Sequence, residues 1–256
     1  MKVDRLAIVG VLNGLPTQDL ETEASAYALL QKHSKSYPAV PWMLQLVKLG
    51  PTRGAQDWNA DEDTLETGQA MGWGGQHGKL GVYVLAHGSL DGLSGIIDEA
   101  KFYVMLKRLD LLSVSKLCLV ACMAAAETVV EGNVIGNPST LSRLCQYLGE
   151  NGRNCKPVMA GWQSFVTVVN AELFNASSAG SKPMTLGTYV NKRSSGAVLD
   201  PSPYEGKKAI NGPRSAAILA SNPISNNCNE KRFYVYADGV TRVANKDWTD
   251  KPGGRI

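Results

Sequence analysis

Long hydrophobic runs, a strong excess of one charge and paired cysteines are all missing from this sequence. No apolar stretch approaches the roughly 18 residues of a membrane helix, so we expect no membrane span. The net charge of +3 is too small for a chain whose main task is to hold nucleic-acid phosphates. Apolar residues make up 44% of the 256 residues, which excludes wholesale disorder and predicts one domain over residues 1–256.

A secretory signal is also missing from the N-terminus as we interpret it. An acid stands among the first basic residues, and the apolar run Leu6–Leu12 is short and lacks a small-x-small cleavage site. We therefore interpret this run as a buried strand. The sequence predicts a cytoplasmic protein, or one secreted by a route that needs no cleaved signal peptide.

Cysteines and histidines are too few for a disulfide or metal framework. The five cysteines are an odd number and include no C-x-x-C pair. Cys118 and Cys122 are four residues apart, a spacing that suits zinc only if a second pair of ligands exists, and the histidines supply none. We therefore expect no metal and no cofactor.

Strand-like and helix-like segments alternate along the chain. The strands are predicted over Leu6–Leu12, Trp42–Leu49, Leu80–Ala86, Lys116–Ala121, Lys156–Gly161 with Ser164–Val169 as one broken strand or hairpin, and a final hairpin over Arg232–Val243. The helices are predicted from Thr17 or Asp19 to about His33, over Ile96–Leu112 and Thr140–Leu148, and over a short stretch at Arg214–Ala220. This alternation predicts an α/β fold with a mainly parallel sheet and an antiparallel edge hairpin.

Two long segments, 51–79 and 174–212, interrupt this alternation. We interpret the first as a partly helical loop, of the length that often forms lids or binding loops. His77 lies in its glycine-rich part, which lacks the Lys-Ser/Thr of a phosphate loop, and we interpret this histidine as exposed. The second segment is interpreted as an extended loop or an inserted subregion.

Two predicted strands have the same form, and each delivers one reactive side chain. The run VYVLA leads into His87-Gly88, and the run LCLVA leads into Cys122. One predicted helix separates the two strands, so we expect them to be parallel neighbours with His87 and Cys122 together at their carboxyl ends. The imidazole can take the thiol proton and later protonate a leaving amine, while backbone N–H groups after the strands hold the oxyanion. The other cysteines are interpreted as inert packing or loop residues.

These two motifs resemble the caspase-like cysteine peptidases of clan CD, in which one hydrophobic strand ends in His-Gly and another ends in Ala-Cys. The bacterial toxin and effector members look closest, because they share a helix between the two strands, a later helix like Leu141–Leu148 and a terminal hairpin. The order of elements is similar from Leu6 to Val243, whereas the sharp motifs cover two short segments. The resemblance implies a three-layer sandwich around the central sheet.

Carried over by position, the resemblance implies that His87 is the general acid and base and Cys122 the nucleophile, with the amides of Gly88 and Cys122 as the oxyanion hole. The segment implied to shape the substrate pocket is Trp162, Gln163 and Ser164. Caspases carry Gln two positions before the cysteine, where this chain has Val120, so aspartate specificity is doubtful.

Two further features bear on specificity and activation. Asp91, Glu127 and Glu131 are near the expected site and are candidates for pairing with a basic substrate side chain, although solvated carboxylates are the simpler interpretation. Some toxin members need inositol hexakisphosphate. The basic residues that could supply such a site, or form only a solvated face, are Lys182, Lys192, Arg193, Lys207 and Lys208.

Three functions compete. The first is a cysteine endopeptidase acting on a protein or peptide substrate, as a bacterial effector or a self-processing protease. The second is a catalytically silent caspase-like scaffold that binds a protein partner, which the unusual Met123-Ala124 after the cysteine leaves open. The third is another α/β thiol enzyme that uses the same pair of residues for acyl transfer.

Overall fold

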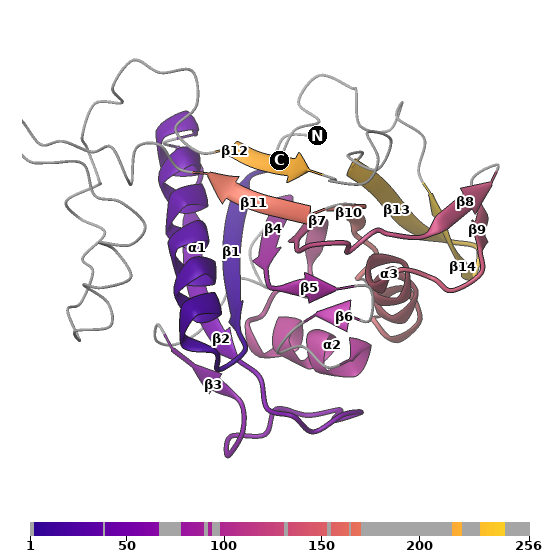
Figure 1. Cartoon of the computed structure of the whole chain (residues 1–256), viewed down its shortest axis with the longest axis horizontal. Coiled ribbons are helices and arrows are strands. Elements are labelled where there is room, and N and C mark those ends of the chain that lie inside the picture. The colour runs from indigo at the N-terminus through magenta and orange to yellow at the C-terminus, as the bar shows by residue number, and fades with distance from the viewer. Residues whose placement is uncertain are drawn as a thin grey trace, which may run out of the picture.

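A mostly parallel β-sheet forms the centre of the fold, and helices lie against both of its faces (Figure 1). The computed structural model describes residues 3–37, 39–66, 78–89, 92–93, 98–130, 133–152, 155–163, 165–169, 217–221 and 231–243. Within this part of the chain the fold is mixed α/β. None of the helices described there is long and apolar enough to cross a membrane.

Five neighbouring strands of the sheet run parallel to one another. In spatial order they are β2 (Trp42–Lys48), β1 (Arg5–Leu12), β4 (Leu80–Leu85), β7 (Val114–Val120) and β10 (Val158–Trp162). Antiparallel strands flank them: β3 (Thr64–Leu65) beside β2, and the hairpin of β13 (Lys231–Ala237) and β14 (Val240–Val243) beside β10. The predicted parallel sheet with an antiparallel edge hairpin is therefore confirmed.

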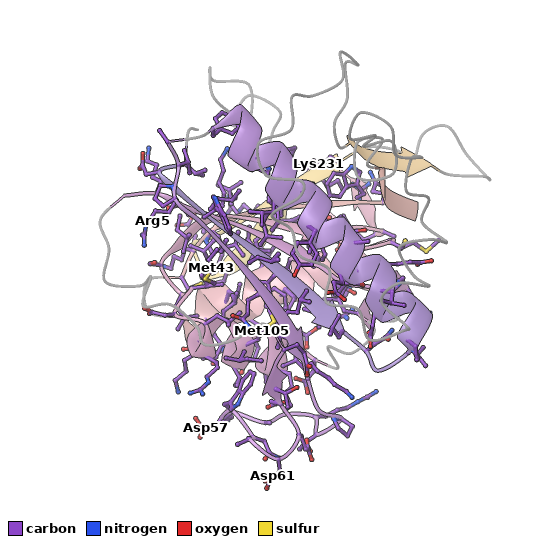
Figure 2. All side chains as sticks on the ribbon, turned by 90° about the vertical axis from the view of Figure 1, so that its left-hand side faces the viewer. Arg5, Met43, Asp57, Asp61, Met105 and Lys231 are labelled. Atoms are coloured by element: carbon purple, nitrogen blue, oxygen red, sulfur yellow. The ribbon has the colours of Figure 1, made fainter. Side chains whose placement is uncertain are left out.

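The helices divide the core into two clusters, one on each face of the sheet. On one face lies α1 (Pro16–Ser36), and on the other lie α2 (Glu99–Arg108) and α3 (Thr140–Asn151). Figure 2 shows α1 crossing the sheet. Side chains alternate along each strand, so Leu85 packs on the α1 face while Val84 packs on the α2–α3 face.

Capping residues set the limits of α2 and α3. The predicted helix Ile96–Leu112 is shorter in the structure because Asp98 caps it, accepting the Lys101 backbone N–H at 2.9 Å. The other predicted helix, Thr140–Leu148, continues through Gly149 to Asn151 and ends at Gly152. Gly149 admits β13, because a Cβ there would lie 2.1 Å from the Tyr236 ring.

Three local predictions are wrong or incomplete. Residues Ala217–Ser221 form a strand, β12, where we predicted a short helix, and β12 pairs antiparallel with β11 (Phe165–Val169). Consequently β10 and β11 belong to different sheets and are neither one broken strand nor a hairpin. Two small hairpins were not predicted: β5 (Gly88–Ser89) with β6 (Gly92–Leu93), and β8 (Thr128–Val130) with β9 (Asn133–Ile135).

The first long loop is described over residues 51–66 and 78–79, and these residues contain no helix. Residues 67–77, which include His77, and the segment 174–212 lie outside the described residues. The described part reaches out beyond the sheet, with Asp57 and Asp61 near its tip (Figure 2).

A buried ion pair fixes this loop to α2. Both carboxylate oxygens of Asp63 lie 2.8 Å from the Lys101 ammonium, and neither side chain is exposed to solvent. The carboxylate also accepts the backbone N–H groups of Gly50 at 2.8 Å and Asn59 at 2.9 Å. Burial raises the pKa of Asp63, but the bonds from Lys101, Gly50 and Asn59 outweigh it and hold that pKa below its ordinary value. The contribution to stability is therefore present near neutral pH and is lost as the pH falls through the lowered value.

Breaking this pair from one side should destabilise the fold. Asp63→Asn leaves the buried Lys101 ammonium unpaired, so we expect the free energy of unfolding in urea to fall by about 3–5 kcal/mol. The double variant Asp63→Asn, Lys101→Met removes that charge and should recover much of the loss. Asp57→Asn is the matched control, because it breaks only the exposed pair with Lys107. Equal effects of Asp63→Asn and Asp57→Asn would contradict the assigned role.

Candidate active site

The pairing of β4 with β7 sets the positions of His87 and Cys122. The two strands are parallel neighbours, with Leu85 opposite Val120 at the end of the ladder. Pairing continues just beyond β4, where the Ala86 N–H donates to the Val120 carbonyl at 3.2 Å. Leu85 and Val120 both face α1, and His87 and Cys122 each follow two residues later, beyond the ends of the strands. The structure thus confirms that the strands leading to His87 and Cys122 are adjacent and parallel, so both residues follow carboxyl ends at the same edge of the sheet.

Gly88 lies directly against the backbone of Cys122. A Cβ built on Gly88 would lie 2.4 Å from the Cys122 carbonyl oxygen and 3.1 Å from its backbone nitrogen. Any side chain at this position would therefore force the segment after β4 away from the turn after β7. A glycine here is a condition for the close approach of the two segments.

The first turns of α1 engage the His87 ring on one of its two nitrogens. His87 Nε2 lies 3.1 Å from the Gln18 carbonyl oxygen and 3.8 Å from Glu21 Oε2. A carbonyl oxygen only accepts hydrogen bonds, so Nε2 carries the proton in this contact. In the neutral ring, Nδ1 is then the basic nitrogen that can receive a thiol proton. No sequence pattern indicates that α1 supplies these groups, because they meet His87 only in the folded chain.

Backbone hydrogen bonds to β10 and to α3 hold the turn after Cys122. Met123 has a positive φ of 55°, so the chain turns sharply just after the thiol. The Ala125 N–H donates to the Trp162 carbonyl at 2.9 Å, and the Ala124 carbonyl accepts the Leu141 N–H at 2.8 Å. These bonds anchor a buried backbone while Cys122 itself stays half-exposed.

Glu127 is engaged inside the fold and does not face a substrate. Its carboxylate accepts the Ser139 backbone N–H and the Tyr234 hydroxyl. Burial first, and then the bond to Glu127, raises the pKa of Tyr234. Glu127 is therefore a structural residue, and neither the specificity role nor the solvated position that we considered fits it. The other two carboxylates considered, Asp91 and Glu131, lie outside the described residues.

The predicted pocket segment is only partly at the site. Trp162 faces α1, but it is 7% exposed and its ring is covered by the Lys231 ammonium, 4.7 Å from the ring centroid. Since Ala160 is opposite Cys118, Trp162 is level with Val120, one side-chain repeat before Cys122. Trp162 therefore packs beneath the site. Gln163 is half-buried, and Ser164 lies outside the described residues, so a pocket role for these two stays a prediction.

The remaining described thiols are buried. Burial raises the pKa of Cys145 to about 12 and that of Cys155 to about 11. Burial also raises the pKa of Cys118, against an opposing effect of Lys231. These three therefore stay protonated near neutral pH, as expected for packing residues. Cys228 lies outside the described residues, as do the basic residues considered for inositol phosphate.

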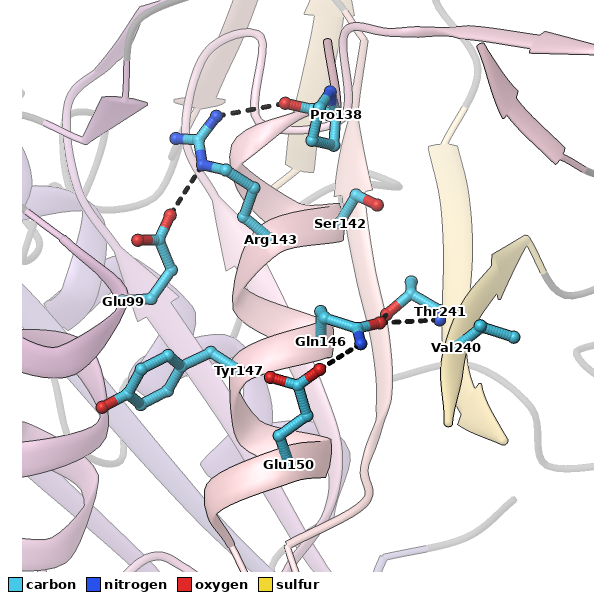
Figure 3. A pocket seen from close by; sticks show the side chains of 9 residues that line it. All are labelled: Glu99, Pro138, Ser142, Arg143, Gln146, Tyr147, Glu150, Val240 and Thr241. Atoms are coloured by element: carbon cyan, nitrogen blue, oxygen red, sulfur yellow. Dashed lines mark hydrogen bonds and ion pairs between the residues drawn. The ribbon is translucent and has the colours of Figure 1, made fainter. Parts of the chain in front are cut away.

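A separate hollow lies across α3, on the α2–α3 face. Its volume is about 440 Å³, and its lining residues are Glu99, Pro138, Ser142, Arg143, Gln146, Tyr147, Glu150, Val240 and Thr241 (Figure 3). Arg143 pairs with Glu99 at 2.6 Å. The side-chain oxygen of Gln146 accepts hydrogen bonds from the Thr241 backbone N–H at 2.9 Å and from the Thr241 hydroxyl at 3.0 Å. These bonds tie α3 to α2 and to β14. The hollow contains neither His87 nor Cys122 and no cluster suited to chemistry.

Two further searches bear on the site. No group of three or more His, Cys, Asp or Glu side chains that could hold a metal ion occurs among the described residues. Comparison with protein-family models, with curated proteins and with solved structures finds no match for this chain.

The described cysteines should differ sharply in reactivity. We expect iodoacetamide near pH 8 to alkylate Cys122 in the folded protein, whereas Cys118, Cys145 and Cys155 react only after unfolding. Peptide mapping by mass spectrometry would locate the modified residues. Prompt alkylation of Cys155 in the folded protein, at the rate of Cys122, would contradict the burial described above.

Gly88 should tolerate no side chain. Gly88→Ala places a Cβ against the Cys122 backbone, so we expect a loss of about 1–3 kcal/mol in the free energy of unfolding. The alkylation rate of Cys122 should change as well, because the His87 segment must move away. Ser89→Ala, at the exposed neighbouring position, is the control and should alter neither quantity. A Gly88→Ala variant with wild-type stability and thiol reactivity would show that the two segments are not in close contact.

Proposed function

We propose that this chain is a cysteine endopeptidase of the caspase-like type. The observation that carries the proposal is that His87 and Cys122 follow the carboxyl ends of the adjacent parallel strands β4 and β7, each two residues after the paired Leu85 and Val120. The layers on the two sides of the sheet, with α1 on one and α2 and α3 on the other, support a caspase-like three-layer sandwich. A partly exposed thiol and a partly exposed imidazole at the same edge of the sheet suit nucleophilic attack on an external substrate.

The first half of the reaction forms an acyl-enzyme. The Cys122 thiol gives its proton to His87 Nδ1, and the sulfur attacks the carbonyl carbon of the scissile peptide. A carbon–sulfur bond forms as the carbonyl electrons move onto oxygen, and the amides of Gly88 and Cys122 are the donors we assign to that oxyanion. The carbon–nitrogen bond then breaks, and the amine leaves with the proton from His87.

The second half restores the enzyme. His87 takes a proton from water, and the resulting hydroxide attacks the thioester carbon. The carbon–sulfur bond breaks, the new carboxylic acid departs, and the proton on His87 returns to the Cys122 sulfur. No redox partner or cofactor enters this balance. The substrate is a protein or peptide, and we retain the bacterial effector or self-processing protease as the proposed setting.

The proposal predicts peptide cleavage that depends on Cys122. We expect purified chain to cut members of a diverse peptide library, with new termini identified by mass spectrometry, and Cys122→Ala to lose at least about a hundredfold in rate. Cys155→Ala is the matched control, because Cys155 is a buried thiol before β10, at the opposite end of the parallel strands. Cleavage that persists in Cys122→Ala would rule out this nucleophile. No cleavage by wild type, with and without inositol phosphates, would favour the silent scaffold.

A further inference from the structure

Glu21 is the acidic side chain that the described structure places beside His87. It lies in the first turns of α1, and its Oε2 is 3.8 Å from His87 Nε2. The other acid of these turns, Asp19, is already occupied, since its carboxylate accepts the backbone N–H groups of Asn13 at 2.7 Å and Gly14 at 3.0 Å. The two carboxylates therefore have different tasks: Asp19 closes the turn from β1 into α1, and Glu21 faces the imidazole.

The contact places a negative charge on the side of the ring that does not take the thiol proton. Gln18 and Glu21 both approach Nε2, which leaves Nδ1 as the nitrogen for exchange with Cys122. The titratable group that the described structure shows against this ring is the Glu21 carboxylate of α1, and Cys122 follows β7, the strand that pairs with β4. When the thiol proton moves to Nδ1 the ring becomes an imidazolium, and only then does the Glu21 carboxylate face a full positive charge.

We propose that Glu21 is a positioning residue that holds His87 in the Nε2–H tautomer and stabilises its imidazolium form, an inference that rests on the proposed function of the His87–Cys122 pair. The Gln18 carbonyl fixes the ring by a neutral hydrogen bond, whereas Glu21 adds the charge. Glu21 is 47% exposed and His87 is 30% exposed, so water weakens the attraction and its effect is moderate. Glu21 contacts no reacting atom and acts through His87.

The pH dependence of Cys122 alkylation tests this role without any peptide substrate. An imidazolium favours the neighbouring thiolate, so removing the Glu21 charge should disfavour the thiolate–imidazolium pair. We expect Glu21→Gln to move the half-maximal rate of Cys122 alkylation by iodoacetamide upward by about half a pH unit. Below that midpoint the variant should react about threefold more slowly than wild type. Thermal unfolding should be unchanged, because glutamine keeps the shape of this exposed side chain.

Two control variants separate this effect from others. Asp57→Asn removes one negative charge from the 51–66 loop, at a carboxylate that is 88% exposed, and should leave the alkylation profile unchanged. His87→Ala removes the imidazole and should shift the profile further than Glu21→Gln does. In the His87→Ala background, Glu21→Gln should have no additional effect, because the carboxylate acts only through the ring.

The possible results of these measurements distinguish the role of Glu21 from the proposed peptidase activity. A Glu21→Gln profile that overlays wild type, while His87→Ala shifts it, overturns the role of Glu21 and leaves the peptidase standing. The expected shift in a chain that cleaves no peptide supports Glu21 and counts against peptidase activity. A wild-type profile unaffected by His87→Ala overturns both, since no imidazolium then exists for Glu21 to stabilise.

Discussion

The parallel pairing of β4 with β7 is the constraint on which the site depends. Side chains alternate along a strand, so a shift of one residue in this ladder would send His87 and Cys122 to opposite faces of the sheet. Both faces of the two strands are buried, with Val82, Val84, Leu117 and Leu119 on the α2–α3 face and Tyr83, Leu85, Cys118 and Val120 on the α1 face. The candidate chemistry therefore begins with hydrophobic packing in strands that carry no reactive group at their centres.

The turn after β7 meets two opposed demands. The thiol must be reachable by a substrate, whereas the backbone that carries it must be fixed. The structure separates the demands by one residue: Cys122 is half-exposed, and the chain turns at Met123 into the buried Ala124 and Ala125. Arg232 on β13 adds bonds to the carbonyls of this segment, so a strand distant in sequence helps to hold the turn that carries Cys122. The short stretch of small residues after the cysteine is what allows this close packing.

The sequence was sufficient for the elements whose patterns are local. Two apolar strands with one helix between them required a parallel pairing, and that pairing brought His87 to Cys122. The sequence was insufficient where contact with a residue distant in the chain decides the type of element or the role of a side chain. The run Ala217–Ala220 suits a helix or a strand, and only β11 selects the strand. Nothing in the sequence distinguishes Glu127 from Glu21. In the fold, however, Glu127 accepts a hydrogen bond from Tyr234, whereas Glu21 lies beside His87.

The bond between Gln146 and Thr241 has a consequence at the far edge of the sheet. β14 is the outermost strand there in the described structure, and an outermost strand offers unpaired backbone groups to any passing chain. Thr241 lies opposite Tyr236, yet its N–H donates to the side chain of Gln146 on α3. The helix thus supplies the acceptor that another strand would otherwise provide. A second chain that paired with β14 at this point would have to displace the Gln146 side chain. This hydrogen bond therefore disfavours self-association through the edge of the sheet.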